Sequence, residues 1–429
     1  MVPGGADHLR RRLERAGTLP LKVSIKPVKT GENMSFMSEI GAVLSSFNTQ
    51  INELDITADA ALLAGTILSC VYSQKSTAYP GLRTLTVRVT DDDENSLYAW
   101  PRLDKILEST SFPMLEMLRI PSHFDCIPAP PAGDSSSFDN LHTLILDGSM
   151  EQESPSIALV ANLLHSTPQL ETLWFKTLTA EQPVTVMNET IPRSVKNPQP
   201  VPIPVLLPKL TRLAVTAPGA GSDLLHCIEA PGLHDLHLDG SRTPSYEEIT
   251  GVELSWSRMD AAQVESSLKR LATRSPELRR LAITSTYLSH EAWRWLLLGG
   301  REGMPFPQLE SLALHGLNPI SGEVVCGFDD ELLMEYARQP NVSLRRLSLR
   351  HCTFALGGPA ILQLFERVDK STSECRLEVD SSCRGITANH LDTLAKNGVT
   401  VVFHQEELNR GEWWSCSYDV DACDSYAYC

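Results

Sequence analysis

The chain has 429 residues, of which 42% are apolar, so it can bury a large core, and its length alone would suggest two or three globular domains. Its 37 Lys and Arg residues stand against 53 Asp and Glu, a net charge of −16, which argues against nucleic acid or an anionic membrane surface as the main partner. Ten cysteines are too few for a disulfide framework in a chain of this length.

The first twenty residues are polar and basic and lack the apolar stretch of a signal peptide. No stretch elsewhere approaches the run of about 18 apolar residues that a membrane-spanning helix needs. The sequence therefore predicts an intracellular protein, cytoplasmic or nuclear, with no membrane partner. Residues 1–18 are interpreted as a helical remnant that caps the region after it.

One short pattern then recurs along the chain: a leucine, two variable residues, a second leucine, one variable residue and a further apolar residue. Nine copies are LRTLTV at 82, LEMLRI at 115, LHTLIL at 141, LETLWF at 170, LTRLAV at 210, LHDLHL at 233, LRRLAI at 278, LESLAL at 309 and LRRLSL at 344. A tenth, INELDI at 51, begins with isoleucine. The spacing between copies is irregular and, on average, longer than the roughly 20–29 residues of common leucine-rich repeats.

The residues between the copies predict helices. Amphipathic stretches with apolar residues three and four apart occupy 156–167, 264–275, 330–339 and 359–368. Proline stands one or two residues before many first leucines, where it ends a helix and starts an extended segment: Pro80, Pro113, Pro168, Pro208, Pro231, Pro276 and Pro307. Each unit is thus predicted to be a strand, a turn and a helix.

Such units predict an α/β, leucine-rich-repeat-like solenoid (a horseshoe) over residues 19–405, with a parallel concave β-sheet and outer helices. The alternative is an ordinary doubly wound α/β sheet with leucine-rich strands. The residue-for-residue recurrence of the pattern favours the solenoid.

Two proline-rich stretches, 128–137 and 179–208, are predicted to be long surface loops. The second ends in QPVPIPVLLP, which could dock into an aromatic groove, although a plain spacer is the preferred interpretation. The acidic, aromatic residues 406–429 are interpreted either as a cap on the last repeat or as a tail.

The alternation of side chains along a strand assigns the two faces of the sheet. The second and third apolar residues of each copy, such as Leu312 and Leu314, should point into the core. The residues between them should line the concave face, where a partner protein could bind; the alternative is a merely solvated face. The candidate contact residues are Trp174, Lys176, Arg212, His237, Asp239, Arg280, His315, Arg346 and Arg350.

This face also suggests a test. Replacing Arg346 and Arg350 by glutamate is expected to abolish partner capture and to change stability by no more than about 0.5 kcal/mol, as for surface substitutions.

The sequence holds no constellation that predicts catalysis, a cofactor or a metal site. Cys416, Cys423 and Cys429 have no zinc-type spacing, and His234 and His237 should face opposite sides of a strand. A dispersed Ser-His-Asp triad, and with it a hydrolase, has no positive support in the sequence. The chain is therefore predicted not to be an enzyme.

The N-terminal segment HLRRRLERAGTLPLKVSI, at 8–25, resembles the phrase that follows the F-box in a group of fungal F-box proteins with a leucine-rich-repeat-like domain. The match is carried by Leu13, Glu14, Arg15, Gly17, Pro20, Leu21, Ser24 and Ile25, and FPMLEMLRI and FPQLESLAL extend it along the chain. The resemblance implies the substrate-recognition part of an SCF ubiquitin ligase receptor, whose F-box binds a Skp-type adaptor while the repeats bind the target.

Only twelve residues precede Leu13, too few for an F-box. The expectation is therefore either a truncated gene model or a repeat-only relative, with adaptor binding only if an F-box exists upstream. A stand-alone leucine-rich-repeat scaffold or inhibitor with no role in ubiquitination is the alternative function. The bound protein is unknown in both cases.

Overall fold

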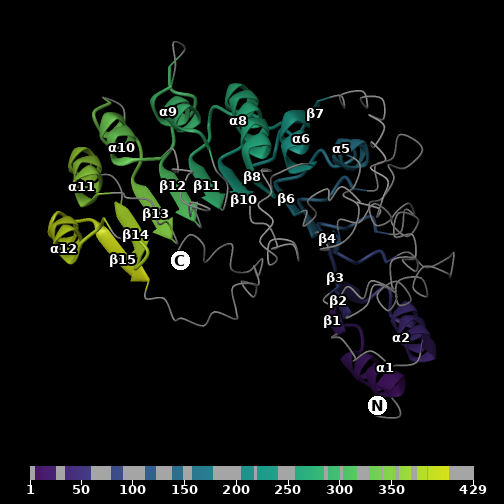
Figure 1. Ribbon diagram of the computed structural model, residues 1–429. Coiled ribbons are helices and arrows are strands. Elements are labelled where there is room, and N and C mark those ends of the chain that lie inside the picture. The colour runs from purple at the N-terminus through teal and green to yellow at the C-terminus, as the bar shows by residue number, and fades with distance from the viewer. Residues whose placement is uncertain are drawn as a thin grey trace, which may run out of the picture.

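The structure is a computed structural model that describes residues 5–25, 34–58, 79–89, 112–121, 138–147, 157–176, 204–216, 220–239, 257–284, 288–299, 303–315, 328–339, 342–350, 352, 357–368, 374–383 and 385–404. Within these residues the protein has an α/β architecture built on one large parallel sheet. Figure 1 shows the strands side by side along a bend, with helices on its outer side.

The large sheet contains 13 parallel strands that follow one another in chain order. They are β1 (Leu21–Ile25), β2 (Ile51–Ala58), β3 (Thr84–Val89), β4 (Met117–Pro121), β5 (Thr143–Asp147), β6 (Thr172–Lys176), β8 (Arg212–Thr216), β10 (Asp235–Asp239), β11 (Arg280–Thr284), β12 (Ser311–His315), β13 (Arg346–Arg350), β14 (Arg376–Asp380) and β15 (Thr400–His404). Two further short strands, β7 (Val205–Leu206) and β9 (Ile228–Glu229), form a separate parallel pair.

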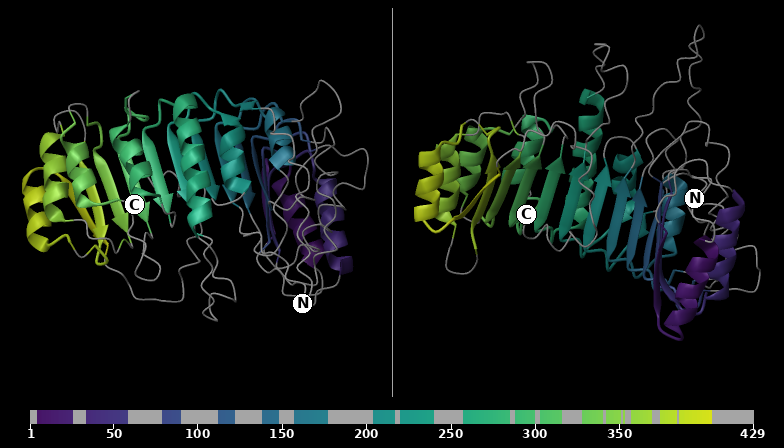
Figure 2. Two further views of the ribbon diagram at one scale, coloured as in Figure 1. Left: turned by 45° about the horizontal axis from the view of Figure 1, so that its top comes forward. Right: turned by 90° about the horizontal axis from the view of Figure 1, so that it is seen from below.

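The helices cover one face of this sheet, as both views in Figure 2 show. They are α1 (Gly5–Ala16), α2 (Met34–Ser46), α5 (Ile157–His165), α6 (Ala220–Cys227), α8 (Ser257–Arg274), α9 (His290–Leu298), α10 (Asp330–Ala337), α11 (Gly358–Arg367) and α12 (Ala388–Lys396). A search of the described helices found none with the length and apolar character needed to cross a membrane.

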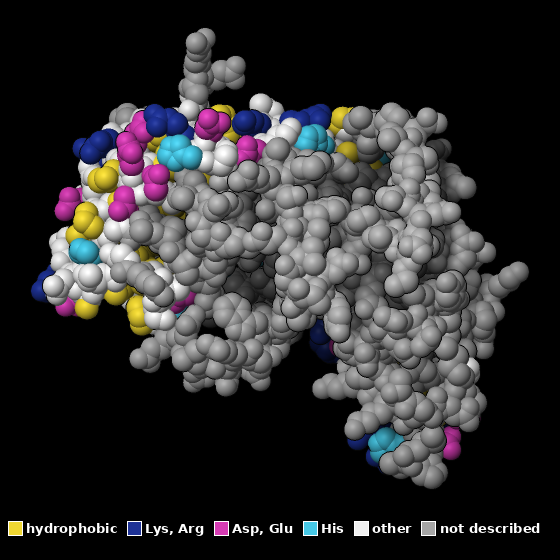
Figure 3. Space-filling model, in the orientation of Figure 1, with side chains coloured by type: hydrophobic (Ala, Val, Ile, Leu, Met, Phe, Trp, Pro, Cys, Tyr) yellow, Lys and Arg dark blue, Asp and Glu magenta, His cyan; other side chains and the backbone are white. Residues whose placement is uncertain are grey.

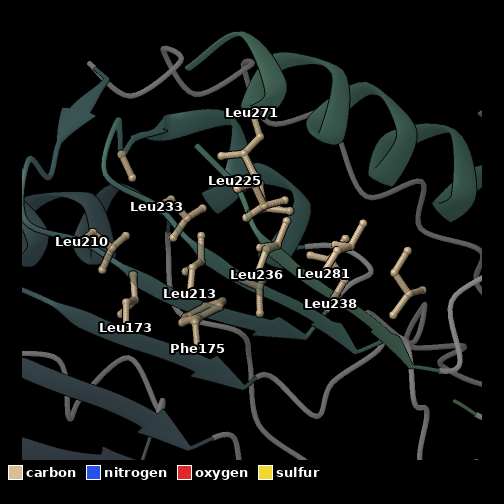
Figure 4. Packing of buried hydrophobic residues seen from close by; sticks show 14 of the residues in the cluster. Leu173, Phe175, Leu210, Leu213, Leu225, Leu233, Leu236, Leu238, Leu271 and Leu281 are labelled. Carbon is tan, nitrogen blue, oxygen red and sulfur yellow. The ribbon is translucent and has the colours of Figure 1, made fainter. Parts of the chain in front are cut away.

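The strands pair in a register that stacks equivalent residues of the recurring pattern. Leu213 pairs with Leu236, which pairs with Leu281. The next apolar position is stacked in the same way, and Leu312 and Leu314 are both fully buried. Figure 4 shows leucines of β6, β8, β10 and β11 pointing to one side of the sheet, toward residues of α6 and α8. The predicted assignment of these leucines to the core is therefore confirmed.

A recurring turn before the strands explains the prolines. The backbone N–H of Leu115 donates to the carbonyl of Phe112, and that of Leu309 donates to Phe306, each at 3.2 Å, so the intervening proline occupies the second turn position that its fixed φ favours. The residue that opens each turn is buried, which adds one core position per unit: Tyr79, Phe112, Phe138, Thr167, Leu207, Ala230 and Phe306. The LxxLxL pattern does not include this position.

Two buried cysteines satisfy backbone carbonyls next to strand ends. Cys352, two residues after β13, donates from Sγ to the carbonyl of Leu314 on β12 at 3.1 Å. Cys383, after β14, approaches the carbonyl of Leu349 on β13 at 3.5 Å. The offset of Cys352 from β13 is the one at which Asn or Cys follows the strand in leucine-rich repeats, whereas Cys383 lies one residue further from β14.

The ten copies of the pattern coincide with ten of the 13 strands, and the four predicted helices are α5, α8, α10 and α11. The other three strands are β1, β14 and β15. They keep the second and third apolar residues of the pattern but lack the first leucine, so the pattern did not identify them. The helices α2, α6, α9 and α12 were also missed.

The predicted loop 179–208 needs a correction at its end. Val205–Leu206 is a strand, and Val205 and Leu207 are buried, because these alternate apolar residues fill the protein's own core beside β9. The end of QPVPIPVLLP is therefore part of the folded core and not a plain spacer. The stretch 128–137, the first part of this loop and the predicted cap or tail at 406–429 lie outside the described residues.

Candidate protein-binding face

We call the face of the large sheet turned away from the helices the inner face. All nine predicted contact residues lie on strands at alternate positions, out of phase with the buried leucines. Arg212, Arg280 and Arg346 begin their strands, Trp174 and His237 are central, and Lys176, Asp239, His315 and Arg350 end theirs. The side chain of Lys176 is outside the described part of the structure.

The first set of contacts on the inner face links three neighbouring strands. Asp235 of β10 lies between Arg212 of β8 and Arg280 of β11 in the register. Its carboxylate accepts a hydrogen bond from Arg280 Nε and lies 3.7 Å from Arg212 Nε. Each arginine side chain is 49% exposed, whereas Asp235 is 23% exposed. One carboxylate thus holds two guanidinium groups that both remain open to solvent.

His237 lies at the centre of β10, where its ring contacts the neighbouring strand β11. Its Nε2 lies 3.0 Å from Thr284 Oγ1 on the next strand. Burial lowers the pKa of His237, and the nearby carboxylate of Asp239 only partly opposes that shift. The ring is therefore neutral at pH 7, so its role is hydrogen bonding and not charge.

Trp174 lies far from the predicted arginines of β13, although Lys176 is on its own strand and Arg212 is on the neighbouring strand β8. It is half-buried on β6, where its register partners are the apolar Ile145 and Ala214. Five strand steps separate it from Arg346 and Arg350 on β13. The structure therefore does not bring the tryptophan and the C-terminal arginines into one compact site.

A second set of contacts, around Glu378 of β14, occupies the C-terminal end of the inner face. The Arg350 Nη2 group donates to Glu378 Oε2 at 2.7 Å, and Arg376 Nε lies 2.8 Å from Oε1. Ser348 donates its hydroxyl to the same carboxylate and lies 3.1 Å from His315 Nε2. Glu378 is only 8% exposed, so two guanidinium groups and a hydroxyl replace its hydration.

These contacts fix the charge states. Burial alone would raise the pKa of Glu378, but the hydrogen bond and charge of Arg350, the charge of Arg376 and the hydrogen bond from Ser348 together lower it. Burial and the charge of Arg350 lower the pKa of His404, against the attraction of Glu378 and Asp380. At neutral pH Glu378 is therefore a carboxylate and His404 is uncharged.

The structure corrects the expectation for Arg350. Its side chain is 22% exposed and held by Glu378, so replacing it with glutamate would place two carboxylates together, and the change would not be neutral for stability. Sequence reasoning missed Ser348, Arg376, Glu378 and His404, because a charged residue between two apolar ones predicts only that it faces the inner side. Glu378 does follow that alternation in RLEVD, which is the one signal that could have found it.

Arg346 is different. It is exposed, and its register neighbours are Ser311 and Arg376, so neither side offers an acidic group. Among the described residues it takes part in no ion pair. By contrast, the helix side mixes both signs of charge, as Figure 3 shows for the C-terminal half, and ion pairs such as Arg294–Glu335 (2.7 Å) form there.

No cluster of three or more His, Cys, Asp or Glu side chains suited to a metal ion occurs within the described ranges. A comparison with models of known protein families finds no match for this sequence, and a comparison with curated proteins finds no relative. The function must therefore be argued from the inner face itself.

Proposed function

We propose that the protein is a leucine-rich-repeat-like solenoid that holds a partner protein against its concave inner face. The observation that carries this proposal is the inner face of β8–β13: the residue that begins each strand is polar, the central residue is Ala on three of the five strands, and both stand on a frame of buried residues that are mostly leucine. Such a frame positions variable side chains without depending on them, as repeat proteins do at their binding surfaces. The turns before the strands and the cysteine after β13 further support the repeat interpretation.

We further propose that the chain is the substrate-recognition part of an F-box-type ubiquitin ligase receptor. The support is the N-terminal phrase, which spans most of α1 and the whole of β1. Leu13 is a buried residue of α1, and Gly17 follows that helix in a left-handed conformation, with φ of 65°. The phrase thus begins the sheet, consistent with a segment that joins a preceding module to a repeat domain. A stand-alone scaffold is the second candidate, since the inner face alone explains protein binding.

Affinity capture from the native cells tests the binding half of the proposal. The full chain would be compared with the variant Arg280→Glu/Arg346→Glu and with a matched control, Arg11→Glu/Arg270→Glu, whose sites are exposed on α1 and α8. The proposal predicts a partner that the inner-face variant loses and the control keeps. If both variants retain every partner equally, the inner face is not the binding surface.

Direct binding to a purified Skp-type adaptor tests the ubiquitin half. The protein would be expressed from its genomic locus, including any in-frame sequence upstream of Met1. Adaptor binding that leaves partner capture intact supports the receptor, whereas partner capture without adaptor binding supports the stand-alone scaffold.

A further inference from the structure

The exposed arginines of the inner face form a regular row at the first position of the strands. From β8 to β13 this position holds Arg212, Asp235, Arg280, Ser311 and Arg346, in register from strand to strand. Arginine therefore occupies every second strand, with one acidic residue in the row. The row therefore carries more positive than negative charge, although the protein as a whole has a net charge of −16. Such a local excess of positive charge attracts an anion to the row.

The contacts within the row leave guanidinium donors available. The recorded ion pair of Arg280 uses Nε, and the single carboxylate of Asp235 serves both Arg280 and Arg212. Ser311 lies between Arg280 and Arg346 in the register, and its short, uncharged side chain adds no charge between the two arginines. Arginine binds carboxylate and phosphate through paired N–H donors, which makes two such groups on either side of a serine suitable for an anionic side chain.

The spacing of the row selects an extended chain. Strands in a sheet lie about 4.8 Å apart, so arginines on every second strand repeat at roughly 10 Å. A polyproline II peptide rises about 3.1 Å per residue with three residues per turn, so every third side chain points the same way at intervals of about 9 Å. Acidic residues at every third position of such a peptide therefore match the arginines of β8, β11 and β13.

We infer that the row Arg212, Arg280 and Arg346 binds an extended acidic peptide of the partner, which crosses the strands with one carboxylate per two strands. This inference rests on the proposed protein-binding function and adds the chemistry of the partner. Nucleic acid is disfavoured for two reasons. Successive phosphates along one DNA strand are about 3.4 Å apart along the helix axis, and the protein as a whole is strongly negative. A flat membrane is disfavoured because the row lies on the inside of the bend (Figure 1).

Fluorescence anisotropy with labelled peptides tests the inference on the full chain. The probe is a peptide of four Glu-Pro-Pro repeats, compared with a peptide of the same composition that has its four glutamates together and with a Gln-Pro-Pro repeat. A twelve-residue single-stranded oligonucleotide serves as the nucleic-acid probe. The protein variants are Arg280→Gln/Arg346→Gln, Arg280→Glu/Arg346→Glu and the control Arg11→Glu/Arg270→Glu.

The spaced acidic peptide should bind more tightly than the clustered one, and the Gln-Pro-Pro peptide should not bind. The affinity of the spaced acidic peptide should fall with added salt. It should also fall about tenfold or more in both inner-face variants, because each contact is charge-assisted. The control should stay within about twofold of the unchanged protein. Equal binding of the two acidic peptides, equal loss in the control, or tighter binding of the oligonucleotide would each overturn the inference.

This experiment separates the inference from the function on which it rests. If inner-face variants lose the captured partner but the spaced acidic peptide does not bind, the acidic chemistry is refuted while the binding face stands. If the peptide binds but partner capture is insensitive to the same substitutions, the row is a genuine anion site and the proposed function of the face fails.

Discussion

Arg346 and Arg350 lie two residues apart on β13, on the same face of the same sheet, yet they belong to different environments. Arg346 is exposed between Ser311 and Arg376 and has no acidic partner among the described residues. Arg350 is mostly covered and donates to the nearly buried Glu378 at 2.7 Å. A shared strand and a shared face therefore do not give a shared role: Arg346 is available to a ligand, whereas Arg350 binds the carboxylate of Glu378.

The difference originates in the neighbouring strand. β14 carries Glu378 at its centre, within reach of arginines from its own strand and from β13. Because the sheet has no helix among the described elements on this face, such a buried carboxylate must find its partners in the sheet itself. The carboxylate of Glu378, at the C-terminal end of the inner face, is thus paired with arginines of the sheet itself, whereas the row on β8–β13 leaves positive charge exposed.

Arg350→Glu should have the largest effect on stability and tests whether Arg350 is held by the fold. The variant removes a cation from Glu378 and places a second carboxylate beside it, so unfolding should become easier by about 3 kcal/mol, the lower end of the range for breaking a buried ion pair. Chemical denaturation with the midpoint and slope fitted separately measures this loss. A loss below about 0.5 kcal/mol would mean that Arg350 is as free as Arg346.

Glu378→Gln should have a smaller effect, about 1–2 kcal/mol. Glutamine keeps an acceptor for one donor, and the two arginines that lose their counter-charge are 22% and 15% exposed, so solvent compensates part of the loss. The double variant Glu378→Gln/Arg350→Gln provides the control. Its cost should be less than the sum of the two single changes, because the residues share one interaction.

The sequence predicted the face of the sheet on which Arg346 and Arg350 lie, but not the residues that each of them contacts. The leucines of RLSLR and RLEVD point into the core, and side chains alternate between the two faces of a strand. The residues between the leucines must therefore lie on the inner face. The alternation therefore found Arg346, Arg350 and the inward direction of their neighbours. It could not show which inward residues meet, since Glu378 and Arg350 are 28 residues apart and come together only through the pairing of β13 with β14.

A different limit explains the elements missed at the C-terminal end of the sheet. β15 (Thr400–His404) lacks the first leucine and leaves Phe403 51% exposed at the end of the sheet, so local sequence gave it little of the core signature. Helices such as α12 are short and largely exposed, and only Leu394 is buried there. Periodicity identifies an element by the core it fills, and it weakens where the structure ends and that core is incomplete.

Arg346→Glu tests whether the exposed arginine of the same strand contributes to stability. Because the side chain is exposed and has no described ion pair, the free energy of unfolding should change by no more than about 0.5 kcal/mol. Thermal unfolding beside Arg350→Glu measures the contrast on one strand. A loss comparable to that of Arg350→Glu would show that Arg346 is held by the fold and is not free for a ligand.

The smallest effect concerns pH, and it follows from the lowered pKa of Glu378. In the unfolded chain a glutamate takes up its proton near pH 4.3, whereas in the folded protein Arg350, Arg376 and Ser348 keep it charged to lower pH. Between these two pKa values the unfolded state binds the extra proton, so stability from this group falls as pH falls. The contribution is complete above the unfolded value.

The measurement is the stability difference between the unchanged protein and Glu378→Gln, followed from pH 7 downward. Subtracting the variant cancels the titration of the many other carboxylates, which is necessary in a chain with 53 acidic residues. The difference should be constant from pH 7 to about 5 and should shrink below about 4.3, because only there does the unfolded glutamate begin to protonate. A difference that grows as the pH falls would mean that burial outweighs the two arginines and raises the pKa, and Arg350 would then be a weaker partner than its geometry indicates.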